Sequence, residues 1–197
     1  MTPNPALPDI EPPHDLGAER AVLGAILLNP SVADQVLPHL RPGHFYRPWH
    51  GQVLHSAQVL HNSRRPVDPV TVHAELARRG VRGEAGRNCG VLIHDLISSV
   101  PVTTSGPHYA QIVLEHAARR RLIQAGTKLI QLAQYGARSD ETRNGNLDDL
   151  MRAVVHEIAC VRAAVDTYHR SELQLSAPAR SQPPEHGRSL RSVGPDR

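Results

Sequence analysis

The sequence predicts an all-α protein in which a small globular group of short helices is followed by an antiparallel pair of longer helices. Three observations support this fold class. Apolar residues recur at helical spacing throughout residues 14–166. Helix-capping residues stand immediately before proline in Asn29-Pro30 and Asp68-Pro69, which is typical of helix starts. No segment shows the apolar–polar alternation of a strand with comparable strength.

The globular part, residues 14–101, is expected to hold five or so short helices. Each begins at a residue that can cap a helix or at a proline that suits its first turn. Gly80 suits the position just after a helix, because glycine readily adopts a left-handed backbone conformation. In the last helix we expect Val91, with Leu92 and Leu96, to face inward. The predicted helices start at Asp15, Asn29, Pro48, Asp68 and Asn88, and the last one ends before Pro101.

Residues 107–165 are expected to form a helical hairpin. Apolar residues at helical spacing extend over 107–135 and again over 146–165, and a polar loop joins the two segments. The apolar stripe on 147–165 is broad for a helix that contacts only its hairpin mate. Either it packs back on its own globular part, or it pairs with a second copy of the chain. The candidate self-association residues are Ile123, Ile130, Leu150, Val154 and Ile158.

The two ends of the chain are expected to be disordered. Residues 1–13 contain five prolines and few apolar residues, and residues 167–197 are rich in Ser, Pro, Arg and Gly. The N-terminal residues lack the basic and apolar regions of a secretory signal. No apolar run approaches the ~20 residues that a membrane span needs. We therefore expect a cytoplasmic protein without membrane contact.

Motifs and composition argue against catalysis by this chain. No glycine-rich loop precedes its single lysine, Lys128, so ATP hydrolysis of the P-loop type is not expected. The histidines lack metal-ligand spacing and no nucleophile motif occurs, so we expect no metal and no cofactor. Cys89 and Cys160 are far apart and resemble free thiols. The net charge of +3 permits weak contact with nucleic acid but does not require it.

Arg119, Arg120 and Arg121 form the strongest local concentration of charge. Three consecutive residues cover nearly the whole circumference of a helix, so at least one should face inward or toward a partner. The favoured interpretation is a solvated face with one ion pair, between Arg119 and Glu115 one turn earlier. The alternative is contact of these arginines with a partner protein or with phosphate groups.

Four segments, in order, resemble the N-terminal domain of DnaB-type hexameric replicative DNA helicases. They are residues 13–28 (PHDLGAERAVLGAILL), 44–50 (HFYRPWH), 65–72 (RPVDPVTV), and 109–117 with 120–123 (YAQIVLEHA and RRLI). The resemblance covers about residues 12–165. The sequence departs from the family pattern in two places. His44 stands where the family usually has an acidic residue, and Arg87, Asn88 and Cys89 replace a glycine-rich stretch that precedes a Tyr-Leu pair in the family.

The resemblance implies an all-α domain with a globular part and a hairpin. In the family, hairpins pair between subunits, six domains form a collar as a trimer of dimers, and the collar receives primase. A motor domain carrying the P-loop follows. Here a Pro/Ser/Arg-rich segment stands after residue 165 instead, so we expect no helicase activity from this chain.

We therefore expect a non-catalytic DNA-replication module that forms a dimer or a trimer of dimers and binds primase or a full-length replicative helicase. DNA contact is expected to be indirect or weak. One alternative is a detached part of a functional replicative helicase. Another is a small helical DNA-binding regulator, although residues 80–88 are too long and glycine-rich for the turn of a helix-turn-helix motif.

Overall fold

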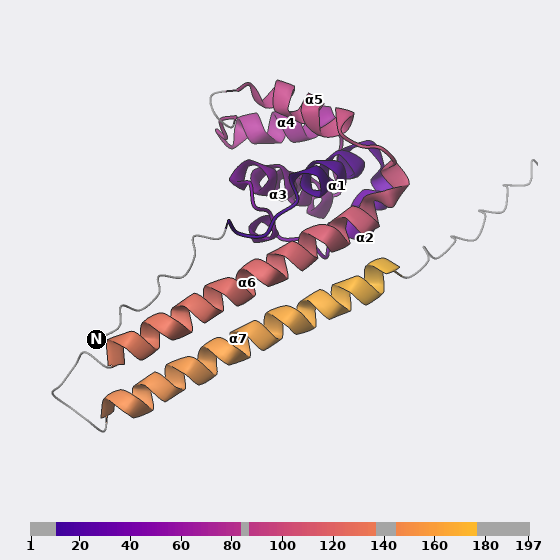
Figure 1. Cartoon of the computed structure of the whole chain (residues 1–197). Coiled ribbons are helices and arrows are strands. Elements are labelled where there is room, and N and C mark those ends of the chain that lie inside the picture. Colours follow the sequence, from indigo (N-terminus) through magenta and orange to yellow (C-terminus); the bar gives the residue numbers. More distant parts are fainter. Residues whose placement is uncertain (1–10, 84–86, 137–144, 177–197) are drawn as a thin grey trace, which may run out of the picture.

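The structure, a computed structural model, describes residues 11–83, 87–136 and 145–176. In these residues every regular element is helical (Figure 1), which confirms the predicted fold class. The globular part is made of α1 (Leu16–Leu28), α2 (Pro30–Val36), η1 (Pro42–His44), α3 (Pro48–Asn62), α4 (Pro69–Arg78), α5 (Cys89–Ser98) and η3 (Thr103–Ser105), and the hairpin is made of α6 (Gly106–Gly136) and α7 (Gly145–Ser176).

Local side-chain chemistry starts and ends the short helices as the sequence predicts. The Asp15 carboxylate accepts the backbone N–H of Ala18 at 2.9 Å and so caps α1. Asn29, Asp68 and Asn88 cap α2, α4 and α5 in the same way. After α4, Gly80 takes a φ of 66°, which lets the N–H of Val81 bond to the Leu76 carbonyl and close the helix end.

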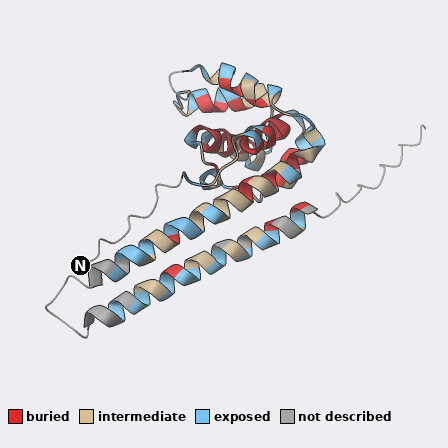
Figure 2. Cartoon of the chain, in the orientation of Figure 1, coloured by how far each residue is buried: buried red, intermediate tan, exposed pale blue. Residues whose placement is uncertain are grey.

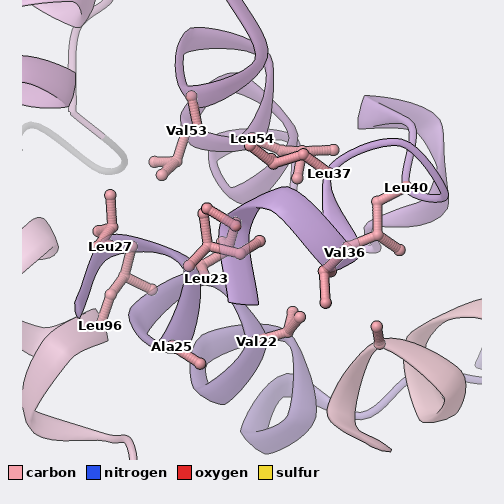
Figure 3. Close-up of a cluster of buried hydrophobic side chains, with 14 of the residues drawn as sticks. Val22, Leu23, Ala25, Leu27, Val36, Leu37, Leu40, Val53, Leu54 and Leu96 are labelled. Atoms are coloured by element: carbon pink, nitrogen blue, oxygen red, sulfur yellow. The ribbon is translucent and has the colours of Figure 1, made fainter. Parts of the chain in front are cut away.

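The core of the globular part is organised around α1. This helix contacts α2, α3, α5 and α6, and its side chains are buried around most of its circumference. Figure 3 shows Leu23 and Leu27 of α1 among apolar side chains from the neighbouring helices. α1 lies so close to α5 that Gly24 faces the Leu96 carbonyl with no room for a Cβ atom. The core therefore depends on a close helix–helix contact as well as on apolar burial.

The hairpin extends away from the globular part (Figure 1). α6 packs against α1 and α2 through its first turns, where Ala110, Val113 and Leu114 are buried, and then continues beyond the globule. α7 runs back along α6, and its last turns return to the core, where Leu175 is buried. The hairpin is therefore anchored at its base by both of its helices.

Two expectations are wrong. α7 continues to Ser176, ten residues beyond the predicted end of the folded unit at residue 166. Tyr168 and Leu175 lie seven residues apart, on one face of α7, and both pack at the core, so their burial outweighs the polar composition around them. Val91 is exposed because Leu92 and Leu96 define the inward face of α5 and Val91 lies on the opposite side.

Some predicted segments lie outside the described residues. These are most of the N-terminal arm, the loop between the hairpin helices and the C-terminal tail, within residues 1–10, 137–144 and 177–197.

Candidate self-association and partner-binding surface

An ion cluster joins the two helices of the hairpin. The Glu157 carboxylate of α7 lies 2.7 Å from Lys128 Nζ and 2.8 Å from Arg121 Nη2, both on α6. The side chain of Glu157 is only 2% exposed. The hydrogen bond from Lys128 lowers the pKa of Glu157 from its usual value, and the charge of Arg121 adds to this effect, while burial opposes it. Because Arg121 and Lys128 lie seven residues apart on one face of α6, Glu157 sets the register of the two helices.

The remaining middle part of the hairpin buries little apolar surface. Among the described residues there, Ala125 is the buried apolar side chain that accompanies Glu157. Figure 2 shows the hairpin mostly in the colours of intermediate and exposed residues, whereas the buried residues gather in the globule. Large apolar side chains on the hairpin are 41–61% exposed, and they are Leu122, Ile123 and Ile130 of α6 and Met151, Val155 and Ile158 of α7.

The predicted self-association residues lie partly in this exposed set. Ile123, Ile130 and Ile158 belong to it. Val154 is half-buried, and the side chain of Leu150 lies outside the described residues. Met151 and Val155 share the exposed stripe of α7 with Ile158, since residues four and seven apart in a helix lie on one face. We call these six exposed residues, from Leu122 to Ile158, the hairpin stripe.

The three consecutive arginines each have a different contact. Arg119 pairs with Glu115 at 2.5 Å on the helix surface, which is the ion pair that the spacing predicted. Arg121 pairs with Glu157 across the hairpin. Arg120 faces the globule, where its guanidinium donates to the carbonyl oxygens of Pro13 at 2.7 Å and His44 at 2.6 Å. Contact of these arginines with a partner or with phosphate stays a prediction.

A buried polar network lies beneath Arg120. The Glu19 carboxylate of α1, 2% exposed, accepts the backbone N–H of Tyr46 at 2.5 Å and faces His50 Nδ1 at 2.7 Å. Burial lowers the pKa of Arg120, and the charge of Glu19 opposes that effect. The network joins α1, the start of α3 and α6, and so it fixes the direction in which the hairpin leaves the globule.

His44 must be neutral in this arrangement. Its Nδ1 atom accepts the backbone N–H of Arg41 at 3.1 Å, which a protonated ring could not do. Burial, with the nearby charges of Arg41 and Arg120, lowers the pKa of His44 to about 4.

The unfolded chain takes up this proton near pH 6.5, whereas the folded chain takes it up only near pH 4. Acid therefore favours the unfolded state between these values. From pH 7 to pH 5 we expect His44 to cost the folded state up to about 2 kcal/mol. In a His44→Gln variant, whose amide oxygen can still accept from Arg41, this part of the loss should disappear. Urea denaturation at both pH values measures the difference, and equal losses in the two proteins would contradict it.

In the part of the chain that the structure describes, no three His, Cys, Asp or Glu side chains are placed to hold a metal ion. Over the same residues, no helix combines the length and apolar character required to cross a membrane.

Comparison with known proteins assigns the family. The family model of the DnaB-like helicase N-terminal domain matches residues 11–115, just over half of the chain. This chain belongs to that family. The N-terminal domain of DnaB helicase from Mycobacterium tuberculosis has a similar structure, with a TM-score of 0.67 and 39% identity over 76% of this chain and 99% of that one.

Other relatives of this DnaB-like domain are longer proteins. The replicative DNA helicase DnaB of Mycobacterium leprae is 40% identical over 76% of this chain, but the match spans only 24% of that helicase. A DnaB-like replicative helicase whose structure describes its interactions with primase matches with a TM-score of 0.56 and 25% identity, over 84% of this chain and 36% of the helicase. The chain thus spans about a quarter of the length of such replicative helicases.

Sequence reasoning missed the polar residues that shape this DnaB-like domain. Glu19 lies on the inward face of α1, and Glu157 lies within the apolar stripe of α7, so each is a charge among apolar neighbours. That pattern is a usable signal, because a buried carboxylate needs partners. The partners themselves, Lys128 and Arg120 among them, could not be found without the fold.

Proposed function

We propose that this DnaB-like domain is a non-catalytic interaction module of DNA replication that self-associates through the hairpin stripe. The observation that supports this most directly is the poor burial within the hairpin itself. Its middle part buries mainly Ala125 and Glu157 among the described residues, while six large apolar side chains face solvent. Exposed apolar side chains gathered on one hairpin favour an interface, and pairing with the same residues of a second copy would cover them.

The geometry disfavours the alternative in which the stripe packs back on its own globule. α7 does reach the core cluster, but through Leu175 near its end and Tyr168 two turns earlier. Val155 and Ile158 lie several turns earlier and are more than half exposed. A second hairpin is therefore the better partner for the stripe, and paired hairpins would build a dimer or, by repetition, a trimer of dimers.

Partner binding extends the same proposal. A DnaB-like helicase with 25% identity is described with its interactions with primase, and we infer a primase or a replicative helicase as the partner of this domain. The greater length of the relatives favours a second candidate function, in which these residues act as the N-terminal part of a complete replicative helicase. The hairpin would have the same role in both cases.

Light scattering against protein concentration tests self-association. We expect residues 1–197 to be dimeric or larger. A Val155→Asp, Ile158→Asp variant should dissociate at least ~100-fold more readily, because each buried charge would occur twice in a two-fold interface. Both positions are exposed in the single chain, so its helix content should not change.

A His169→Asp, Gln174→Asp variant is the matched control, since it adds the same charge at exposed positions on α7 outside the stripe. It should associate like the parent. A parent protein that is monomeric at every concentration would overturn the proposal.

A further inference from the structure

Two adjoining hollows flank α6 where it leaves the globule. Their volumes are about 210 and 300 Å³, and both are lined by Gly43, Arg120 and Gln124. We call them together the neck groove. The larger hollow is also lined by Pro12, Phe45, Tyr46 and Ile123, and the smaller one by Arg41, His44, Ala117, Arg121 and Tyr168, among others.

The two halves of the neck groove differ in chemistry. The larger hollow is lined by Tyr46, by the nearly buried Phe45 and by Ile123, which is 51% exposed. Aromatic-lined grooves bind proline-rich segments well, because such segments are already extended and lose little entropy. The smaller hollow is lined by Arg41 and by Arg121, whose guanidinium also pairs with Glu157 across the hairpin. An extended segment with proline, apolar side chains and a carboxylate would therefore complement both halves.

The N-terminal end of the described chain already enters this groove. Pro12 lines the larger hollow. The carbonyl of Pro13 accepts the guanidinium of Arg120, and the ring of His14 stacks on Tyr46 with 4.0 Å between centroids and 7° between planes. The described part of the chain therefore begins at the groove.

We propose that residues 1–10 of the same chain dock in the neck groove. Their sequence, MTPNPALPDI, supplies three prolines, the apolar Leu7 and Ile10, and the carboxylate of Asp9. An extended proline-rich segment advances ~3.1 Å per residue, so Asp9 lies about 9 Å from Pro12. From Arg120 to Gln124, α6 rises about 6 Å, so the segment is long enough to cross both hollows. Its attachment at Pro12 gives it a high effective concentration at the groove.

Docking would regulate self-association. Ile123 belongs both to the neck groove and to the hairpin stripe, so a docked arm would cover part of the surface that a second hairpin needs. This regulatory step rests on the proposed function, whereas the docking itself does not.

Hydrogen exchange, read by mass spectrometry on the full chain, tests the docking. An Asp9→Lys, Ile10→Ser variant should lose the arm's contacts, and exchange in residues 41–46 and 117–124 should become several-fold faster. A Thr2→Lys, Asn4→Ser variant alters the same arm but none of the prolines, apolar side chains or the carboxylate on which the docking depends, and it should exchange like the parent. Both variants should keep the parent's thermal midpoint, because they leave every residue of the described core unchanged.

The outcomes separate docking from self-association. Identical exchange in the Asp9 variant and the parent would overturn the docking. Protection that disappears on dilution would assign the groove to the arm of another copy and overturn docking within one chain. If docking holds and the hairpin pairs, light scattering should show several-fold tighter self-association in the Asp9 variant. If the hairpin does not pair, the exchange result still decides the docking.

Discussion

A Glu19→Ala substitution is expected to lower the free energy of unfolding by about 3–5 kcal/mol, because it leaves several buried donors without an acceptor. The carboxylate accepts the N–H of Tyr46 and faces Nδ1 of His50, and both contacts lie inside the globule. Without it, the half-buried charge of Arg120 also loses the anion that favours it. Urea denaturation at pH 7 measures the loss, and near-UV circular dichroism should show loosened packing around Trp49.

Glu115→Ala is the matched control for this result. It removes a carboxylate from another helix, where this carboxylate forms an exposed ion pair with Arg119. Exposed pairs contribute roughly 0–1 kcal/mol, so the control should remain close to the parent. Similar losses for both variants would show that Glu19 does not organise a buried network.

A Gly24→Ala substitution is the second change with a large expected effect. A Cβ atom at this position would lie 2.4 Å from the Leu96 carbonyl oxygen and 2.3 Å from Cγ2 of Val100. Because a backbone atom cannot swing aside as a flexible side chain can, α1 and α5 would have to separate. We expect a loss of about 2–3 kcal/mol in the free energy of unfolding, as for other overpacked cores.

Gly126→Ala should have the opposite sign. Gly126 is also inside a helix, but a Cβ atom there meets no other atom within 4 Å. Replacing glycine by alanine in a helix interior gains roughly 0.5–1 kcal/mol. Thermal unfolding midpoints of the two variants and the parent measure the effect of the same substitution at a crowded position, Gly24, and at an open one, Gly126. A Gly24→Ala variant as stable as Gly126→Ala would refute the close contact between α1 and α5.

The features that the sequence predicts well are those decided by near neighbours along the chain. Asp68 illustrates this, since its carboxylate caps α4 by accepting the N–H groups of Val70 and Thr71. The features that sequence reasoning missed depend on residues that are distant along the chain. Glu19 meets His50, 31 residues away, and Arg120 meets Pro13, 107 residues away. Local spacing does not identify such pairs. In the same way, the sequence does not show why position 24 must be glycine, because the reason is the close contact with α5.

The candidate surface shows the same division. Helical periodicity placed Ile123, Ile130 and Ile158 on an apolar face, and the structure finds all three exposed. Periodicity alone could not decide whether that face meets the globule or solvent, because this depends on where α7 returns. Spacing predicted the ion pair of Arg119 with Glu115 and an inward-facing arginine in the run, but it could not predict that Arg121 meets Glu157 or that Arg120 meets the loop at His44.

Because α7 ends at the core, the hairpin is an extension that starts and ends at the same globular part. α6 leaves the core after Leu114, and Leu175 of α7 belongs to the same core cluster. Removing equal whole turns from both helices would draw the tip inward by about 1.5 Å per residue and leave both anchoring ends in place. The length of the hairpin could therefore change without any change in the globular part. The diameter of any ring built from paired hairpins would change with it.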